Sequence, residues 1–153
     1  MTLPNLETAL EVERDHKHLT EQMARFKLFV KSEPEPEHYS RWRLEFLWQL
    51  RDFKNRLLKH FDLEEEGGFM EDVMVMAPHC ARQIKELKKE HERIPVLMDG
   101  ILAELKAMTK MDSDKLARIQ SRISEVMGTL REHENQEHKL IQNAYYSEYG
   151  GPA

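Results

Sequence analysis

The sequence predicts an all-α protein folded as an up-down-up-down antiparallel four-helix bundle, and three observations support this prediction. Apolar residues recur at steps of three and four through four long stretches, which is the spacing of amphipathic helices. Short segments with proline, glycine or a capping aspartate separate these stretches, and the alternating pattern of a strand is absent. Helices with such short connections pack as antiparallel neighbours. At 153 residues the chain has the usual length of one domain, so we expect residues 1–153 to form a single bundle.

The first two helices are separated by a Pro-Glu-Pro run at residues 34–36, because proline cannot continue a helix. The first helix is predicted from about Leu3 to Lys31. Its apolar face consists of Leu6, Ala9, Val12, His16, Leu19, Met23, Phe26 and Val30. The second helix is predicted from the end of that run to Gly67-Gly68, since glycine suits a helix C-terminus. Its apolar face consists of Tyr39, Trp42, Phe46, Leu50, Phe53 and Leu57, and it continues onto His60 and Glu64.

The last two helices have equally clear starts. Residues 69–76 are apolar and predict a partial turn of helix, after which Pro78 fits the first position of the third helix. The third apolar face consists of Ile84, Leu87, His91, Ile94, Met98, Ile101, Leu105 and Met108. Asp112 or Ser113 caps the fourth helix, which is predicted to run to about Tyr146. Its apolar face consists of Leu116, Ile119, Ile123, Val126, Leu130, His133 and Glu137.

Composition excludes several classes of protein. The net charge of −5, with both signs interspersed, gives no basis for binding nucleic acid. The chain has one cysteine, which rules out an intrachain disulfide and fits a reducing compartment. No stretch approaches the roughly 18 apolar residues of a membrane span, and the N-terminus lacks a secretory pattern. We therefore expect a cytoplasmic protein, and the sequence leaves its oligomeric state open.

Two histidine–glutamate pairs continue the apolar faces of the second and fourth helices. His60 and Glu64 are four residues apart, as are His133 and Glu137, so each pair shares one face of its helix. Both pairs follow core residues in register and therefore point into the bundle. A buried carboxylate is costly unless it is paired or bound to a metal. These pairs are the main indication of a functional site.

Antiparallel packing predicts four core histidines at one level, one from each helix. Residues on antiparallel neighbours lie level when they are equally far from the turn that joins the helices. For His16 with His60, His60 with His91, and His91 with His133, the midpoint falls in or near a predicted connection. The histidines are therefore expected to meet in the bundle interior.

The two glutamates complete a predicted metal site. The second and fourth helices run in the same direction, so Glu64 and Glu137 each lie one turn, about 6 Å, beyond their histidines and face each other. Imidazole and carboxylate suit iron, manganese or zinc, and helical bundles build two-metal sites this way. We expect the metal ligands to be His16, His60, Glu64, His91, His133 and Glu137. With both carboxylates bridging, each ion has four protein ligands and room for a small molecule; ordinary hydrogen-bonded core histidines are the competing interpretation.

The remaining polar candidates carry less weight. Glu13 lies near the core edge of the first helix and is either a further ligand or a solvated side chain. Four histidines fall off the apolar faces and are interpreted as surface residues: His18, His38, His79 and His138. Four glutamates are interpreted as surface charges or as charges surrounding the ligands: Glu65, Glu66, Glu90 and Glu134.

Four motifs resemble the hemerythrin-like, or HHE cation-binding, family. They are Asp15-His16-Lys17-His18-Leu19, His60-Phe61-Asp62-Leu63-Glu64-Glu65, Glu90-His91-Glu92-Arg93-Ile94 and His133-Glu134-Asn135-Gln136-Glu137. Their order and spacing match over nearly the whole chain. The resemblance implies a non-haem di-iron centre, with manganese or zinc as substitutes for the two iron ions. It also implies that the partner is a small molecule such as dioxygen, nitric oxide or peroxide, bound or sensed, or that the protein handles iron.

The sequence departs from the pattern that the resemblance implies for oxygen-carrying hemerythrins. Those proteins have two histidines four residues apart on the third helix. Here Leu87 and Pro95 occupy the positions four before and four after His91. The fourth helix carries Glu137 four residues after its histidine, where the carriers use an aspartate five residues on. Generic di-iron binding is therefore favoured over reversible oxygen carriage.

Three functional classes stay open from the sequence. A binding or sensing protein is favoured over an enzyme. A di-iron oxidase or peroxidase, or a repair factor for iron–sulfur clusters, is the alternative; repair proteins of this family usually carry an N-terminal cysteine-bearing segment, which is absent here. A metal-free helical module that binds a protein partner is the third class.

Overall fold

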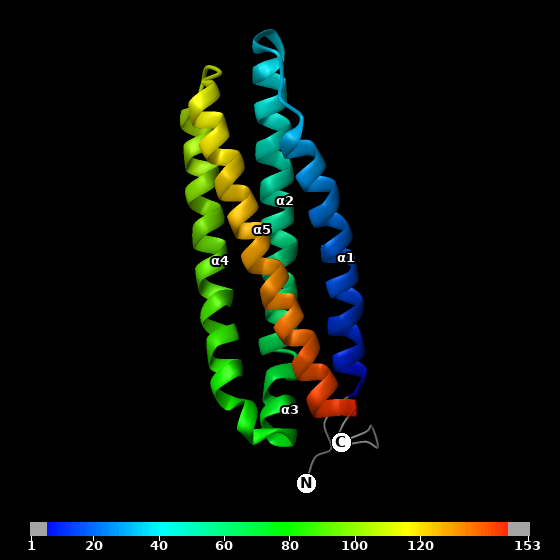
Figure 1. The fold of residues 1–153 in the computed structure, drawn as a ribbon. Helices are drawn as coiled ribbons and strands as arrows, with labels where there is room; N and C mark the ends of the chain where they lie inside the picture. The colour runs from blue at the N-terminus through cyan, green and yellow to red at the C-terminus, as the bar shows by residue number, and fades with distance from the viewer. Residues whose placement is uncertain (1–5, 147–153) are drawn as a thin grey trace.

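Four long helices run side by side along residues 6–146, the part of the chain that this computed structural model describes (Figure 1). They are α1 (Leu6–Lys31), α2 (Tyr39–Glu65), α4 (Ala81–Ala107) and α5 (Ser113–Ile141). Successive long helices alternate in direction, and no strand occurs within residues 6–146. The prediction of an all-α four-helix bundle is confirmed. The predicted start of the first helix at Leu3 lies outside the described residues.

At the end of the bundle where α1 connects to α2, polar contacts join the start of α2 to the end of α4. A short 3₁₀ helix, η1 (Pro36–His38), leads directly into α2. The Tyr39 hydroxyl donates a hydrogen bond of 2.6 Å to the carbonyl oxygen of Met108. Arg43 donates to the same carbonyl at 3.2 Å, which satisfies a group left without a partner inside the helix. These hydrogen bonds fix the position of α2 relative to α4 along the bundle axis.

The start of α5 agrees with its predicted cap. The Asp112 carboxylate accepts hydrogen bonds from the backbone N–H groups of Asp114 at 3.1 Å and Lys115 at 3.2 Å. This is how an aspartate N-cap stabilises the first turn of a helix. At its other end α5 continues into a π-helical segment, η3 (Gln142–Tyr146), so the helical backbone extends as far as predicted.

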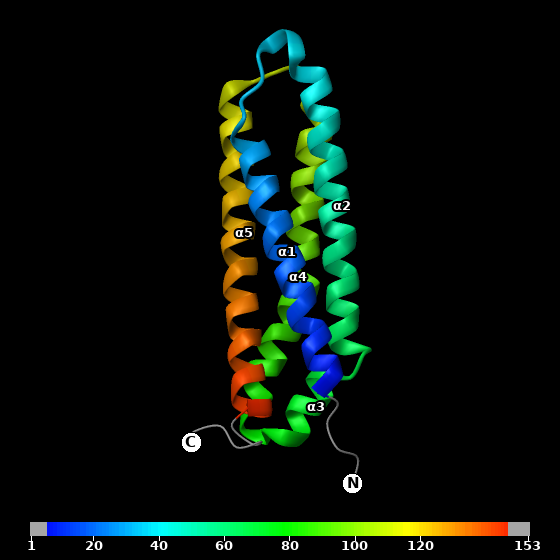
Figure 2. The ribbon, with the colours of Figure 1, turned by 90° about the vertical axis from the view of Figure 1, so that its right-hand side faces the viewer.

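The connection between α2 and α4 contains a helix, α3 (Phe69–Met76), where the sequence predicts only a partial turn. Gly68 begins it with φ of 89°, a left-handed conformation that favours glycine. The side chains of Phe69, Met70 and Val73 are buried beneath the bundle, so packing stabilises a helix too short to form alone. A second 3₁₀ segment, η2 (Pro78–Cys80), then leads into α4. Figure 2 shows α3 lying across the end of the bundle where α1 begins and α5 ends.

The core is divided into two apolar clusters. The larger fills the end where α1 connects to α2 and includes Phe46, Phe53 and Ile101. The smaller lies against α3 and includes Phe69 and Leu87. A polar layer of buried histidine and glutamate side chains lies between them. Within residues 6–146, no helix is both long enough and apolar enough to cross a lipid bilayer.

Candidate metal centre

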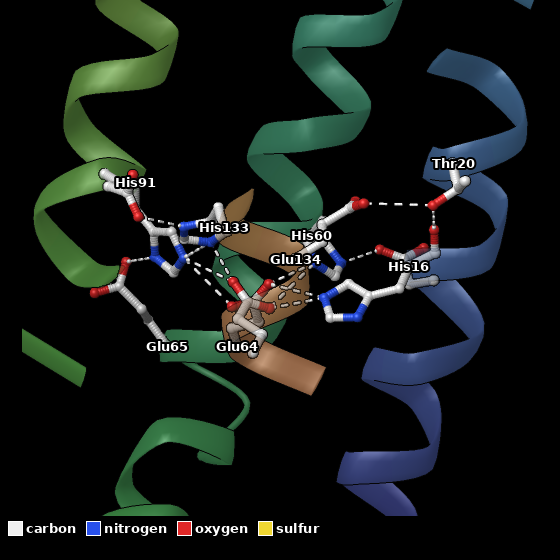
Figure 3. A network of polar contacts seen from close by, with 11 residues as sticks. His16, Thr20, His60, Glu64, Glu65, His91, His133 and Glu134 are labelled. Carbon is white, nitrogen blue, oxygen red and sulfur yellow. Dashed lines mark hydrogen bonds and ion pairs between the residues drawn. The ribbon is translucent and has the colours of Figure 1, made fainter. Parts of the chain in front are cut away.

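Six side chains from all four long helices meet in the polar layer (Figure 3). They are His16 from α1, His60 and Glu64 from α2, His91 from α4, and His133 and Glu137 from α5. Each is at most 9% exposed, and Glu64, His133 and Glu137 are fully buried. The structure thus brings together all the residues that the sequence places on the inner faces at one level, while their role as ligands stays a prediction.

The ligating atoms of these residues form two groups of four. Within each group the atoms lie within 4.8 Å of one another. One group contains the histidines of α1 and α2, the other contains the histidines of α4 and α5, and both contain Glu64 and Glu137. A further group, Glu35, Glu37 and His38, is exposed in the α1–α2 connection, where acidic clusters are common without a metal.

Glu64 faces both histidine pairs, one with each carboxylate oxygen. Its Oε1 contacts Nε2 of His60 and lies 3.9 Å from Nε2 of His16. Its Oε2 lies 3.3 Å from Nε2 of His91. A carboxylate placed in this way can bridge two metal ions.

Glu137 shows the same arrangement from the opposite helix. Its Oε2 accepts a hydrogen bond of 2.7 Å from Nε2 of His16 and lies 3.9 Å from Nε2 of His60. Its Oε1 contacts Nε2 of His133 and lies 3.7 Å from Nε2 of His91. The two carboxylates therefore form the shared middle of the site, with a pair of imidazoles at either side.

Several of the converging atoms are buried and lie in close ion-pair contacts that lack hydrogen-bond geometry. Within residues 6–146, this holds for Nε2 of His60, both carboxylate oxygens of Glu64 and Oε1 of Glu137. Nε2 of His91 and Nε2 of His133 lie 3.2 Å apart, where a hydrogen bond is possible only if one of them carries a proton. Buried polar atoms normally have partners. A donor set of imidazole nitrogens and carboxylate oxygens fits transition-metal ions, which would satisfy these atoms.

Three of the four histidines are held from behind by a carboxylate at Nδ1. The pairs are His60 with Asp15 at 2.5 Å, His91 with Glu65 at 3.0 Å, and His133 with Glu90 at 3.1 Å. A proton on Nδ1 donated to a carboxylate leaves Nε2 free to bind a metal and fixes the orientation of the ring. The sequence interpretation left Glu65 and Glu90 between surface and surrounding charges, and the structure shows them beside the histidines.

Asp15 is the residue that sequence reasoning missed as an individual candidate. It precedes His16, so on α1 it points about a quarter-turn away from the inner face, toward α2. There its carboxylate meets His60, a residue of the neighbouring helix. The sequence did contain a signal for this contact. The antiparallel alignment that places His16 level with His60 also places Asp15, the residue before His16, close to His60.

The carboxylates change the acid–base behaviour of the histidines. Burial by itself lowers the pKa of His60, but the neighbouring carboxylates of Asp15, Glu137 and Glu64 outweigh it and raise the pKa to about 12. Burial likewise lowers the pKa of His91, and the carboxylates of Glu137, Glu64 and Glu65 raise it to about 10. Without metal, both histidines are therefore protonated at neutral pH.

The two shared carboxylates are unequal. Burial raises the pKa of Glu64, and the charge of Glu137 beside it raises that pKa further. Burial also acts to raise the pKa of Glu137, but the neighbouring imidazoles of His133, His16 and His60 outweigh it, so this carboxylate is held in its charged form. In the metal-free site, protonated imidazoles thus lie in close ion pairs with the charged carboxylate of Glu137.

An aromatic side chain covers the α4 side of the site. The ring of Phe61 stacks on that of His91, with centroids 4.1 Å apart and planes at 18°. It also meets His133 edge-on at 5.5 Å. This ring excludes water from the second histidine pair and holds both imidazoles in place.

The weaker sequence candidates lie outside the two groups. His18, His38, His79 and His138 are all exposed, as interpreted from the sequence. Glu13 is half-buried and lies 3.3 Å from Nδ1 of His138 instead of in the centre.

The chain matches the family model described as the hemerythrin HHE cation binding domain over residues 9–145. The chain belongs to this family. The match spans the six converging residues and confirms the resemblance seen in the motifs, and it implies that this HHE domain binds a metal. Neither the comparison with curated proteins nor the comparison with solved structures gave a match.

Proposed function

We propose that this HHE domain holds two iron ions and that the ion pair binds or senses a small molecule such as dioxygen, nitric oxide or peroxide. The observation that carries the proposal is that Glu64 and Glu137 each present one oxygen to each histidine pair. His16 and His60 would hold one ion and His91 and His133 the other, with both carboxylates shared. Manganese or zinc could take the place of iron in the same donor set.

The chain's own residues prepare the site for such an ion pair. Asp15, Glu65 and Glu90 hold three imidazoles with Nε2 turned inward, and Phe61 keeps water from one side. Bound iron would supply reversible one-electron oxidation and a position for a small ligand. A metal-free interaction module gives no reason for two buried carboxylates that face four imidazoles without hydrogen-bond geometry at three of their four oxygens, which argues against that class.

The ligand count favours sensing or turnover over oxygen storage. Leu87 and Pro95 lie one turn before and one turn after His91, and both are buried. The helix α4 therefore offers a single ligating nitrogen to the centre. Coordination positions not filled by the protein would be left to solvent or a small anion, and bound solvent would favour oxidation over reversible oxygen binding. Iron handling and peroxide chemistry are compatible with the same arrangement.

Metal content tests the proposal directly. Protein produced in iron-rich medium and purified without chelator is expected to contain two iron ions per chain by elemental analysis. His60→Ala and Glu64→Ala are each expected to lower that content strongly. The first removes an imidazole ligand of one ion, and the second removes a carboxylate that both ions would share. His18→Ala, on an exposed position of α1, is the matched control and should retain the full content. Only trace metal in the wild type would contradict the proposal.

Reaction with dioxygen separates the functional alternatives. Reduced, iron-loaded protein is mixed with oxygenated buffer and followed by absorbance, oxygen consumption and peroxide release. We expect the iron to be oxidised, with no oxygen recovered under vacuum. Release of peroxide over repeated turnovers would assign an oxidase instead of a sensor. Oxygen that stays bound for hours and is released under vacuum would place the protein among the carriers.

A further inference from the structure

His16 differs from the other three histidines of the centre. Among residues 6–146, no side chain forms a hydrogen bond or ion pair with its Nδ1, whereas His60, His91 and His133 each have a carboxylate there. At 9% it is also the most exposed of the six converging residues. Its ring is therefore the least constrained, and a small rotation about its side-chain bonds would open the centre on this side.

A cavity of about 430 Å³ lies directly outside His16, between α1 and α5. We call it the α1–α5 mouth; it is lined by Glu13, His16, Lys17, Thr20, Glu21, Glu134, Asn135 and His138. Three of these residues are glutamates and one is a lysine, so the lining favours cations. His16 forms part of both the mouth and the centre, and the mouth thus leads to the metal ligands.

Glu134 is the unusual residue of this mouth. Its side chain is 9% exposed, and its Oε2 accepts a hydrogen bond of 3.3 Å from the Thr20 hydroxyl (Figure 3). Its other oxygen, Oε1, is buried and has no hydrogen-bond partner within residues 6–146. A structural tie between α5 and α1 needs only one oxygen. Burying the second oxygen without a partner destabilises the fold through its desolvation, unless a ligand binds there.

The outer end of the mouth carries a further pair of ligand-type side chains. Oε1 of Glu13 lies 3.3 Å from Nδ1 of His138, which is exposed. Carboxylate and imidazole groups therefore follow one another from solvent to the centre: Glu13 with His138 outside, Glu134 within, and His16 at the base. Each step offers groups that replace part of the water shell of a transition-metal cation.

The neighbouring α4–α5 face is less suited to cations. A cavity there is lined by Arg82, Lys89 and Arg93, which outnumber its two carboxylates, Glu86 and Glu90, so its net charge is positive. The stacked ring of Phe61, from α2, also covers His91. The end of the bundle is closed by the apolar cluster against α3. Electrostatics and access both favour the α1–α5 mouth.

We propose that the α1–α5 mouth is an uptake site for divalent transition-metal ions, in which Glu134 binds the incoming ion and passes it to His16. The inference rests on the proposed function, because the destination of the ion is the two-metal centre. Glu134 acts on the rate of loading and is not a ligand of the filled centre. Removing its charge should therefore slow uptake and leave the final metal content unchanged.

Stopped-flow loading of metal-free protein with Co²⁺, followed by the visible absorption of the bound ion, tests this inference. Glu134→Gln is expected to lower the uptake rate by about tenfold, in the range by which local charge alters association rates. The rate of the wild type should also fall more steeply with salt than that of the variant. The matched control is Glu132→Gln, which makes the same change at an exposed position of α5 and should load at the wild-type rate.

The outcomes distinguish this inference from the proposed function. Equal loading rates for the wild type, Glu134→Gln and Glu132→Gln would overturn the uptake site while leaving the metal centre intact. A lower final content in Glu134→Gln would make Glu134 a ligand of the centre and also overturn the inference. A wild type that binds no metal would contradict the proposed function itself. Circular dichroism of the metal-free variants checks their fold, and Glu13→Gln, at the outer end of the mouth, is an independent variant expected to slow uptake.

Discussion

His60 and His91 show how single side chains of this site are prepared for a metal and also compete with it. Carboxylates at Nδ1 turn Nε2 toward the interior, but the same carboxylates and the shared glutamates raise the pKa of both rings, to about 12 and about 10. The protonated rings stabilise the metal-free fold. Because these pKa values are raised by folding, the contribution is complete below the ordinary histidine pKa of about 6.5 and is lost as the pH rises through about 10 for His91 and about 12 for His60.

Metal binding should therefore release protons at neutral pH. A metal ion needs the neutral imidazole, so loading must displace at least about two protons per chain, one each from His60 and His91. Lowering the pH from 8 to 6 should weaken binding, since protons then compete more strongly. Titration with Zn²⁺ in weak buffer containing a pH indicator measures the release, and calorimetry in buffers of different ionisation enthalpy checks it. An affinity that does not change with pH would mean that the rings are already neutral before the metal arrives.

At the scale of single residues, the sequence specified the inner shell of the site better than its surroundings. His16, His60 and Glu64 lie on apolar faces, so helical periodicity alone aligns them with the core. Asp15 and Glu134 lie off the predicted inner faces of their helices, and their positions depend on how neighbouring helices are rotated about their axes. That rotation is set by side-chain packing between helices, and the apolar periodicity of a single helix does not predict it.

At the scale of elements, the long helices were predictable because each has a continuous apolar face and a recognisable start. The Asp112 cap is the clearest case, since its carboxylate meets the first free N–H groups of α5. The short helix α3 was underestimated because eight residues give too little periodicity to distinguish a helix from a turn. Its existence depends on burial of Phe69, Met70 and Val73 against the bundle, which is tertiary information.

Replacing glycine by alanine should change the free energy of unfolding in opposite directions at Gly68, in the turn before α3, and at Gly128, within α5. Gly68→Ala should destabilise the protein by about 1–2 kcal/mol, because φ of 89° places an L-residue in a left-handed conformation, although an added Cβ would meet nothing within 4 Å. Gly128→Ala, in the exposed middle of α5 with equally open space, should stabilise by up to about 1 kcal/mol. Chemical denaturation of both variants measures the difference. A change of the same sign in both would show that backbone conformation at Gly68 does not control the turn.

At the scale of the whole molecule, the centre joins all four long helices between two apolar clusters. The polar layer contains buried atoms that have no hydrogen-bond partners among residues 6–146, so this level of the bundle is weakly held without metal. An ion pair bound there would tie α1, α2, α4 and α5 together at one height. A bound metal would therefore act on the stability of the entire fold as well as supply its chemistry.

Loading with metal should accordingly raise the melting temperature. A ligand that binds only the folded state stabilises it by about 2.7 kcal/mol when its free concentration is a hundredfold above Kd, and a chain of this size gains roughly 2–4 °C per kcal/mol. We expect a rise of roughly 5–10 °C between chelator-treated and iron-loaded protein, measured by circular dichroism under anaerobic conditions. The double variant His60→Ala, Glu64→Ala should melt at one temperature with and without metal, since it lacks part of each ligand group. Equal melting temperatures for the wild type in both states would mean that the four helices do not depend on the centre, and that the unpartnered atoms are satisfied by water.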